Sequence, residues 1–224
     1  MYEIGVKSKL LIGMALGVLL SVGASASPIL VDNASFENLP LGGLTFTCGV
    51  GCSYSGVPTP IPGWTSTGGE GQLQPGTNAG NFTLFSTLSD GITSASSNGG
   101  TISQTVIPTV ALGVTYVLQV DVGKRNDLPA TGTVNLLING NLIGAVGAAP
   151  TSGNWSTFTA AYTGLAADVG QSITIQLAAS GIQGNFDNVR LSDDLGTVPE
   201  PATATVLALG LAGIFAYVSR KRTL

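Results

Sequence analysis

Short runs in which apolar and polar residues alternate fill the middle of the chain. The clearest run spans 115–122, where every second residue from Tyr116 to Val122 is a large apolar one. A period of two places such side chains on one face of a β-strand, toward a core. The same pattern predicts further strands at 101–107, 133–138, 141–146, 155–162, 172–178 and 186–191.

Turn signals separate these runs. Asn139 and Gly140 stand between two of them and predict a two-residue β-hairpin. Residues 42–63 and 68–80 are rich in Gly, Pro, Ser and Thr and are predicted to be loops. No amphipathic helix is evident, so the pattern predicts an all-β fold, an antiparallel meander closed into a β-sandwich over residues 27–192.

The N-terminus carries an export pattern. Lys7 and Lys9 precede the apolar stretch 10–20, and the small residues 24–26 follow it. This order is typical of a secretory signal peptide, here residues 1–26, with a helical apolar part and cleavage after Ala26. The alternative is an uncleaved membrane anchor.

The C-terminus has three parts: a polar linker at 193–201, an uncharged apolar run at 202–218 and a basic tail at 219–224. As a helix the apolar run reaches roughly 26 Å, which just spans a bilayer. The basic cluster should keep its own end in the cytoplasm and leave the preceding chain outside. The alternative is a buried core helix. The basic residues are Arg220, Lys221 and Arg222.

The linker ends in the motif Val198-Pro199-Glu200-Pro201. With the apolar run and the basic cluster behind it, this tail resembles the PEP-CTERM sorting signal of Gram-negative bacteria. The resemblance implies recognition and processing by an exosortase, after transient anchoring in the inner membrane, and delivery to the cell surface or extracellular matrix. Two prolines also keep the motif extended and open to a processing enzyme.

Charge narrows the range of partners. Charged residues make up 9% of the chain. Residues 27–197 contain ten acidic and three basic side chains, which gives a net charge of −7. Phosphate binding needs the opposite sign, so the charge argues against a nucleic-acid partner, and none is predicted.

The chain has no histidine, which removes Ser-His-Asp and Cys-His nucleophiles and histidine-ligated metals. Its two cysteines, Cys48 and Cys52, enclose three residues. In an exported protein they are predicted to form a disulfide, the alternative being a reactive redox pair.

Three short motifs bear a second resemblance. They are Asn33-Ala34-Ser35-Phe36-Glu37, Pro62-Gly63-Trp64 and Phe186-Asp187-Asn188-Val189. Together they resemble the galactose-binding-like jelly rolls of many bacterial carbohydrate-binding modules. The resemblance implies that the first and last strands lie side by side, with a structural calcium ion between them held by Glu37 and Asp187. The alternative is that both carboxylates bond to neighbouring backbone or to Arg190.

Glycan sites combine an aromatic face with polar groups that read hydroxyls. Trp64 is a candidate contact, with a core position as the alternative, and Tyr54 and Phe85 are further candidates. Arg125 and Asn126, in the polar cluster 124–127 after the clearest strand, are candidates for contacting an acidic or hydroxyl-rich polymer; a solvated turn is the alternative.

The function predicted from the sequence is that of an exported, non-catalytic matrix or biofilm protein that binds extracellular polysaccharide. A structural matrix protein without a defined ligand is the alternative. A glycoside hydrolase needs only two carboxylates, and Asp121 with Asp127 or Glu70 with Asp90 are the pairs available. Nothing in their spacing selects them, so no enzyme is predicted.

Overall fold

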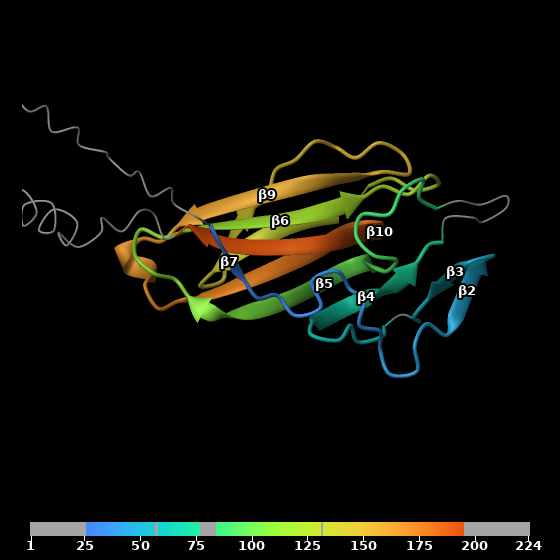
Figure 1. Cartoon of the computed structure of the whole chain (residues 1–224), viewed down its shortest axis with the longest axis horizontal. Helices are drawn as coiled ribbons and strands as arrows, with labels where there is room; N and C mark the ends of the chain where they lie inside the picture. Colours follow the sequence, from blue (N-terminus) through green and yellow to red (C-terminus); the bar gives the residue numbers. More distant parts are fainter. Residues whose placement is uncertain (1–25, 57, 77–83, 131, 195–224) are drawn as a thin grey trace, which may run out of the picture.

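The computed structural model describes residues 26–56, 58–76, 84–130 and 132–194, which form an elongated β-sandwich (Figure 1). A single 3-10 turn, η1 (Ala166–Asp168), occurs among them. The strands are β1 (Ser27–Ile29), β2 (Phe46–Gly49), β3 (Cys52–Tyr54), β4 (Thr65–Gln74), β5 (Ser94–Thr109), β6 (Thr115–Gly123), β7 (Gly132–Ile138), β8 (Asn141–Gly144), β9 (Trp155–Thr163) and β10 (Ser172–Asp194).

Two long strands, β5 and β10, belong to both layers of the sandwich. The first part of β10, residues 172–179, pairs with β7 on one side and β5 on the other. The last part of β10 pairs with β6 and, at its end, with β1. Between these parts the β5–β10 register shifts twice, and opposite this shift Gly99 and Gly100 adopt φ of 85° and 152°. Glycine takes this backbone without strain, so β5 can turn the corner between the layers.

The core lies between the two layers and is built from the alternating apolar residues. Leu118, Val120, Leu177 and Phe186 are fully buried in it. Each comes from a run in which the intervening residues are polar or small, so one-sided burial explains why the alternation is visible in the sequence.

The all-β antiparallel fold is confirmed, and every predicted strand is found. The β7–β8 hairpin turns at Asn139 and Gly140, both with positive φ (49° and 78°), as a type I′ turn requires. The first and last strands pair, Ile29 opposite Leu191.

Two expectations about the strands are wrong. The strands do not follow one another as a meander, because β10 pairs with β1, β5, β6 and β7, and the main path runs β2-β3-β4-β5-β10-β6-β9. The predicted loops contain strands, the β2–β3 hairpin within 42–63 and most of β4 within 68–80. Both segments are rich in glycine and small polar residues and show no alternation, so periodicity could not reveal them.

The predicted signal peptide and all of the chain from residue 195 onward lie outside the described residues. In the part of the chain that is described, no helix is long and apolar enough to cross a membrane.

Candidate functional site

A groove of about 440 Å³ opens where β5 and β10 bend from one layer to the other. We call it the bend groove. Its lining combines hydroxyl, amide and charged groups with aliphatic side chains and one aromatic ring. It is lined by Cys48, Tyr54, Ser55, Leu73, Leu84, Ser96, Asn98, Arg125, Asp127, Leu128, Ile182 and Gln183.

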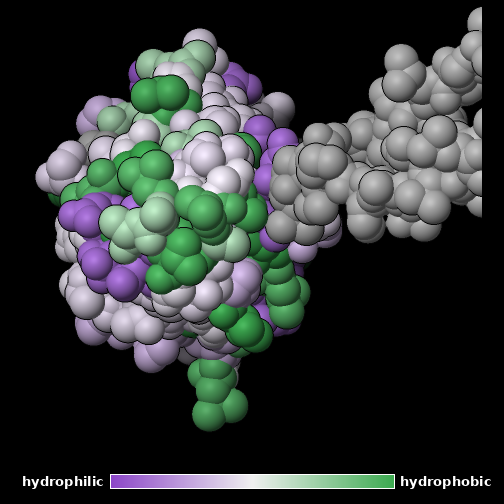
Figure 2. Space-filling model, turned by 90° about the vertical axis from the view of Figure 1, so that its left-hand side faces the viewer, coloured by the Kyte–Doolittle hydropathy of each residue, from purple (hydrophilic) through white to green (hydrophobic). Residues whose placement is uncertain are grey.

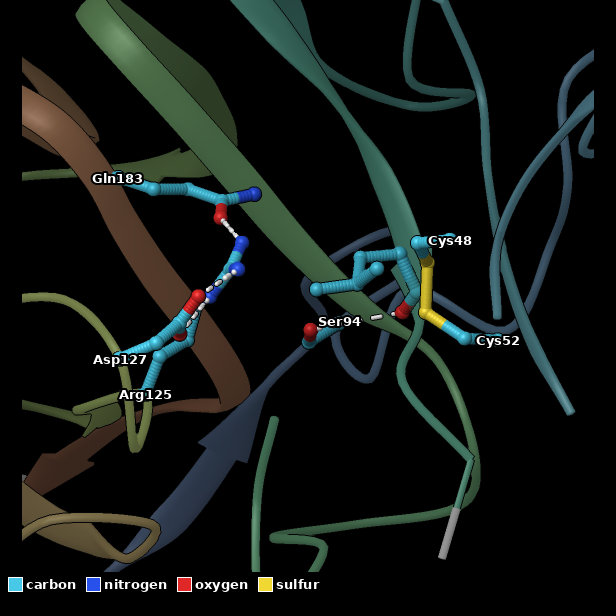
Figure 3. Close-up of a disulfide and its surroundings, with 7 residues drawn as sticks. Cys48, Cys52, Ser94, Arg125, Asp127 and Gln183 are labelled. Carbon is cyan, nitrogen blue, oxygen red and sulfur yellow. Dashed lines mark hydrogen bonds and ion pairs between the residues drawn. A yellow bond between two sulfur atoms is a disulfide. The ribbon is translucent and has the colours of Figure 1, made fainter. Parts of the chain in front are cut away.

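Arg125 is the best-anchored polar side chain of the bend groove. Its Nε donates to Asp127 Oδ1 at 2.9 Å and its Nη2 to Asp127 Oδ2 at 2.7 Å, while Nη1 donates to Gln183 Oε1. Figure 3 shows Arg125, Asp127 and Gln183 on one side and the disulfide on the other. A guanidinium held by two partners has few conformations left to lose, so it is preorganised for contacts with a ligand.

The groove carries little net charge. Among the described residues that line it, Arg125 and Asp127 are the charged ones, and they form an ion pair. The hydrogen bonds from Arg125 hold the pKa of Asp127 below its usual value, so both groups stay charged at neutral pH. A balanced pair among amides and hydroxyls suits a hydroxyl-rich ligand better than a polyanion.

The opposite side of the groove is the β2–β3 hairpin. Cys48 and Cys52 are joined by a disulfide across this hairpin. Tyr54 stacks on Phe46 with ring centroids 5.4 Å apart and contributes to the lining. The disulfide therefore fixes the hairpin that presents the aromatic ring.

Asn126 lies beside the groove, on its exposed rim. Its backbone N–H donates to Leu84 O at 2.9 Å, and Lys124 exchanges backbone hydrogen bonds with the 153–154 turn. The polar cluster 124–127 is thus a fixed turn in which Arg125 points into the groove while Asn126 is absent from its lining.

The other aromatic candidates are buried. Trp64 is 7% exposed, packs on Phe36 at a centroid distance of 5.3 Å and donates from Nε1 to Asn33 O. Phe85 is 1% exposed and stacks on Trp155 at 4.7 Å. The structure therefore favours the core alternative for Trp64, because its ring faces other side chains rather than a ligand.

Glu37 and Asp187 meet at the loop 88–93. Glu37 Oε1 accepts from the backbone N–H groups of Ile92 and Thr93, both at 2.8 Å. Asp187 accepts from the backbone N–H of Asp90 at 3.0 Å and of Asn188 at 2.7 Å. Both carboxylates therefore bond to neighbouring backbone, as the alternative to calcium expected, and they hold the loop between them.

Asp187 is unusual because it is 2% exposed and stands among other acids. Burial raises its pKa to about 8, and the charges of Asp90 and Glu37 act in the same direction. Among the described residues no group of three or more Asp, Glu, Cys or His side chains is arranged to hold a metal ion. One buried carboxylate, Asp187, and one exposed carboxylate, Glu37, are oxygen ligands of the kind that a hard cation takes, and backbone carbonyls would supply the further ligands.

Apart from Asp127, the carboxylates considered for a catalytic pair lie outside the bend groove. Asp121 accepts from Thr157, Ser89, Asn188 and Arg190. Burial raises its pKa, but these hydrogen bonds outweigh burial and hold the pKa below its usual value. Neither Asp121 nor Glu70 nor Asp90 lines the bend groove.

A model of the HpiC1 cyclase family matches residues 27–192, which is the sandwich without the last two residues of β10. The chain belongs to the HpiC1 cyclase-like family. A model of the PEP-CTERM protein-sorting motif matches residues 197–222. The predicted sorting tail, with Val198-Pro199-Glu200-Pro201 and Arg220-Lys221-Arg222, is therefore confirmed as a PEP-CTERM motif. No curated protein matches the chain.

Solved structures similar to this HpiC1-like domain include carbohydrate-binding modules. The CBM22-2 xylan-binding domain of Xyn10C from Paenibacillus barcinonensis is 16% identical, with 59% of this chain and 92% of that chain covered and a TM-score of 0.40. The CBM22-1-CBM22-2 tandem of the same protein is 16% identical, with 82% of this chain and 50% of that chain covered and a TM-score of 0.46. The enzymatically active domain of tailspike protein 4 from bacteriophage CBA120 is 14% identical, with 74% of this chain and 21% of that chain covered and a TM-score of 0.39.

Sequence reasoning missed several groove residues of this HpiC1-like domain. Asp127 belongs to the polar cluster 124–127 and could have been named with Arg125. Gln183 could not, because it is one polar residue in the middle of β10 with no local pattern. Only the bend of β10 brings it to Arg125, 58 residues away in the chain.

Proposed function

We propose that this protein is exported, sorted by an exosortase at its PEP-CTERM tail, and binds an uncharged, hydroxyl-rich polysaccharide of the extracellular matrix in the bend groove. The observation that carries the binding proposal is the Arg125–Asp127–Gln183 array in a groove that also contains Tyr54. Such an array reads hydroxyl groups with fixed donors and acceptors, while an aromatic ring covers the apolar face of a sugar.

An array of neutral and acidic polysaccharides, probed with the full chain in detergent, tests this proposal. Neutral glycans should bind, and Arg125→Ala should weaken their binding about tenfold or more, since truncating one partner of a hydrogen-bonded charge pair is costly. Arg190→Ala is the matched control, because Arg190 also pairs with an aspartate but lies outside the bend groove. Preference for polyanions, or equal loss in both variants, would contradict the assignment.

The sorting route is tested in cells. The signal at 1–26 should be removed, residues 202–218 should hold the chain in the inner membrane with 219–224 in the cytoplasm, and an exosortase should cut near Val198-Pro199-Glu200-Pro201. Mass spectrometry of the secreted protein would show both new termini. Full-length protein in the cytosol with both termini intact would contradict this route.

A structural calcium ion is the proposed cofactor. Glu37 and Asp187 would hold it, and it would offset the negative charge around the buried Asp187. Calcium at about one hundred times its dissociation constant would add about 2.7 kcal/mol to stability. Chelation should therefore lower the Tm of the full chain, and Glu37→Gln should remove the difference. An unchanged melting curve would eliminate the ion.

Binding without catalysis is the role that the groove supports. Its carboxylate, Asp127, is kept ionised by Arg125 and is therefore a poor proton donor at neutral pH. Asp187, with its pKa of about 8, lies beside Trp155 and the loop 88–93, in a crevice too small to hold a water molecule. Release of reducing ends from a bound polysaccharide would contradict the non-catalytic role. If no glycan on the array binds, the alternative of a structural matrix protein is favoured.

A further inference from the structure

One end of the sandwich presents large apolar side chains to solvent. Leu112 is 66% exposed, Leu165 60% and Val169 52%. We call these three residues the apolar tip. Figure 2 looks at this end of the molecule and shows hydrophobic residues gathered on it. Exposed apolar groups that cluster in this way are typical of a surface that meets another apolar phase.

The apolar tip is a fixed surface, although it comes from two separate turns. Gly113 N donates to Gly164 O at 2.9 Å and Gly164 N donates to Val114 O at 2.9 Å. Gly170 N donates to Val110 O at 2.8 Å. These backbone bonds tie the β5–β6 turn to the β9–β10 connection, so Leu112 and Leu165 cannot separate without breaking them.

The chain leaves the sandwich at this same end. Asp194, the last described residue, pairs with Thr115, which directly follows the β5–β6 turn. The PEP-CTERM match begins at residue 197 and the apolar run at residue 202. Seven residues, 195–201, reach at most about 25 Å when fully extended. The start of the apolar run therefore lies within about that distance of Asp194.

Charge decides which kind of lipid surface fits. Asp168, Asp193 and Asp194 lie on the turns and strand end beside the tip, and each would repel anionic headgroups. Apolar side chains flanked by acids suit a bilayer surface of zwitterionic phospholipid, where leucine and valine enter the boundary between headgroups and acyl chains.

We propose that the apolar tip rests in the interface of the bilayer that holds residues 202–218, so that the sandwich stands on the membrane until the tail is cut. The contact rests on the proposed membrane segment and adds a second point of attachment to it. It places the groove at the far end from the lipid. It also keeps Asp194, the strand end from which the sorting tail continues, close to the membrane surface.

The test uses the full chain in vesicles of phosphatidylethanolamine and phosphatidylcholine. Leu112→Cys is labelled with an environment-sensitive NBD dye, the native disulfide being left intact. Ile92→Cys is the matched control, since Ile92 is 58% exposed and lies just before the start of β5, whereas Leu112 lies just after its end. On reconstitution, the emission at position 112 should rise about twofold and shift to the blue, and that at position 92 should stay at its value in water.

Flotation of the same samples separates the two proposals. Vesicles that carry the chain while the label at position 112 stays in water would overturn the tip contact alone. A chain that does not float would overturn the membrane segment and the tip contact together. Adding Leu165→Asp to the labelled chain should return the emission at position 112 to its value in water without loss of flotation. If Leu165→Asp leaves the emission at position 112 unchanged, the emission change comes from insertion of the dye itself, and the tip contact is overturned.

Discussion

The two ends of the sandwich differ in the side chains that they present to solvent. At the β2–β3 end, a disulfide, an ion pair and amide groups surround a groove, and Arg125 is hydrogen-bonded to Asp127 and Gln183. At the other end, two tight turns expose leucine and valine, and their polar groups are satisfied by backbone bonds between the turns. Both ends are held in place by hydrogen bonds, but the groove end surrounds a cavity with polar groups, whereas the other end exposes apolar side chains flanked by acids.

This difference assigns ligand recognition to the groove end and membrane attachment to the apolar tip. Directional donors and acceptors select a ligand by its hydroxyl pattern, whereas exposed aliphatic groups gain free energy in any apolar phase. The chain leaves at the apolar end, beside Thr115, so the selective end points away from the sorting tail. The predictions that follow test whether the two ends behave independently.

Among the substitutions proposed here, one in the core between the two ends should lower the free energy of unfolding the most. Leu118 is fully buried, and Leu118→Ala should lower the free energy of unfolding by about 2–5 kcal/mol through lost burial and a cavity. Leu112→Ala, at the apolar tip, should change it by less than about 0.5 kcal/mol. Urea denaturation measures both, and a comparable loss at Leu112 would mean that the tip is part of the core.

Removing the disulfide should affect the groove end alone. Replacing Cys48 and Cys52 with serine should cost about 2 kcal/mol, because the unfolded chain gains the freedom of the small loop. Glycan binding should weaken since the Tyr54 hairpin is released, while an NBD label at position 112 should respond to vesicles as before. A change at the tip would show that the two ends are coupled.

Glu70 offers a pH-dependent test at the bend that connects the layers. It is fully buried, and neither carboxylate oxygen has a hydrogen bond of ordinary geometry. Burial raises its pKa above 4.5, and the backbone N–H groups of Glu70 and Thr101 offset this only in part. The unfolded chain therefore loses this proton at lower pH than the folded one, and stability declines as pH rises above 4.5.

Glu70→Gln removes that ionisation. The variant should be more stable than the natural chain by about 1 kcal/mol at pH 7, with the difference fading below pH 4.5. Thermal melts at both pH values measure it. A variant that is less stable at pH 7 would show that the carboxylate has a partner that glutamine cannot replace.

The ion pair in the groove should contribute least to stability. Hydrogen bonds from Arg125 lower the pKa of Asp127 below 3.8, so the pair stabilises the fold above pH 3.8 and is lost as pH falls through the lowered value. The Asp127 side chain is 32% exposed, and Asp127→Asn should cost about 0.5 kcal/mol at pH 7. Its effect on glycan affinity should be larger, and an effect on stability alone would remove Asp127 from the site.

Alternation in the sequence predicted the strands that have one buried face. Residues 115–122 and 172–178 show it because polar residues on one face leave the other to Leu118, Leu177 and their neighbours. Strand β4 escaped because Gly68, Gly69 and Gly71 interrupt any period, and its pairing with β5 depends on a register shift that no local pattern reveals.

The candidate site was predicted only in part. Arg125 stood out because cations are rare in this acidic domain, and Tyr54 was one of several loop aromatics, but Gln183 reaches the groove only through the bend of β10. Trp64 was indistinguishable from a ligand contact, because a tryptophan in a Pro-Gly-Trp turn can point either way, and packing on Phe36 decides it.

Hydrogen exchange on the full chain, with and without a neutral glycan identified on the array, tests the separation of the two ends most directly. We predict slower exchange in 46–54, 124–128 and 182–183, and no change in 111–114 or 164–170. Protection confined to the turns of the apolar tip, or no protection with any neutral glycan, would contradict the assignment of recognition to the bend groove.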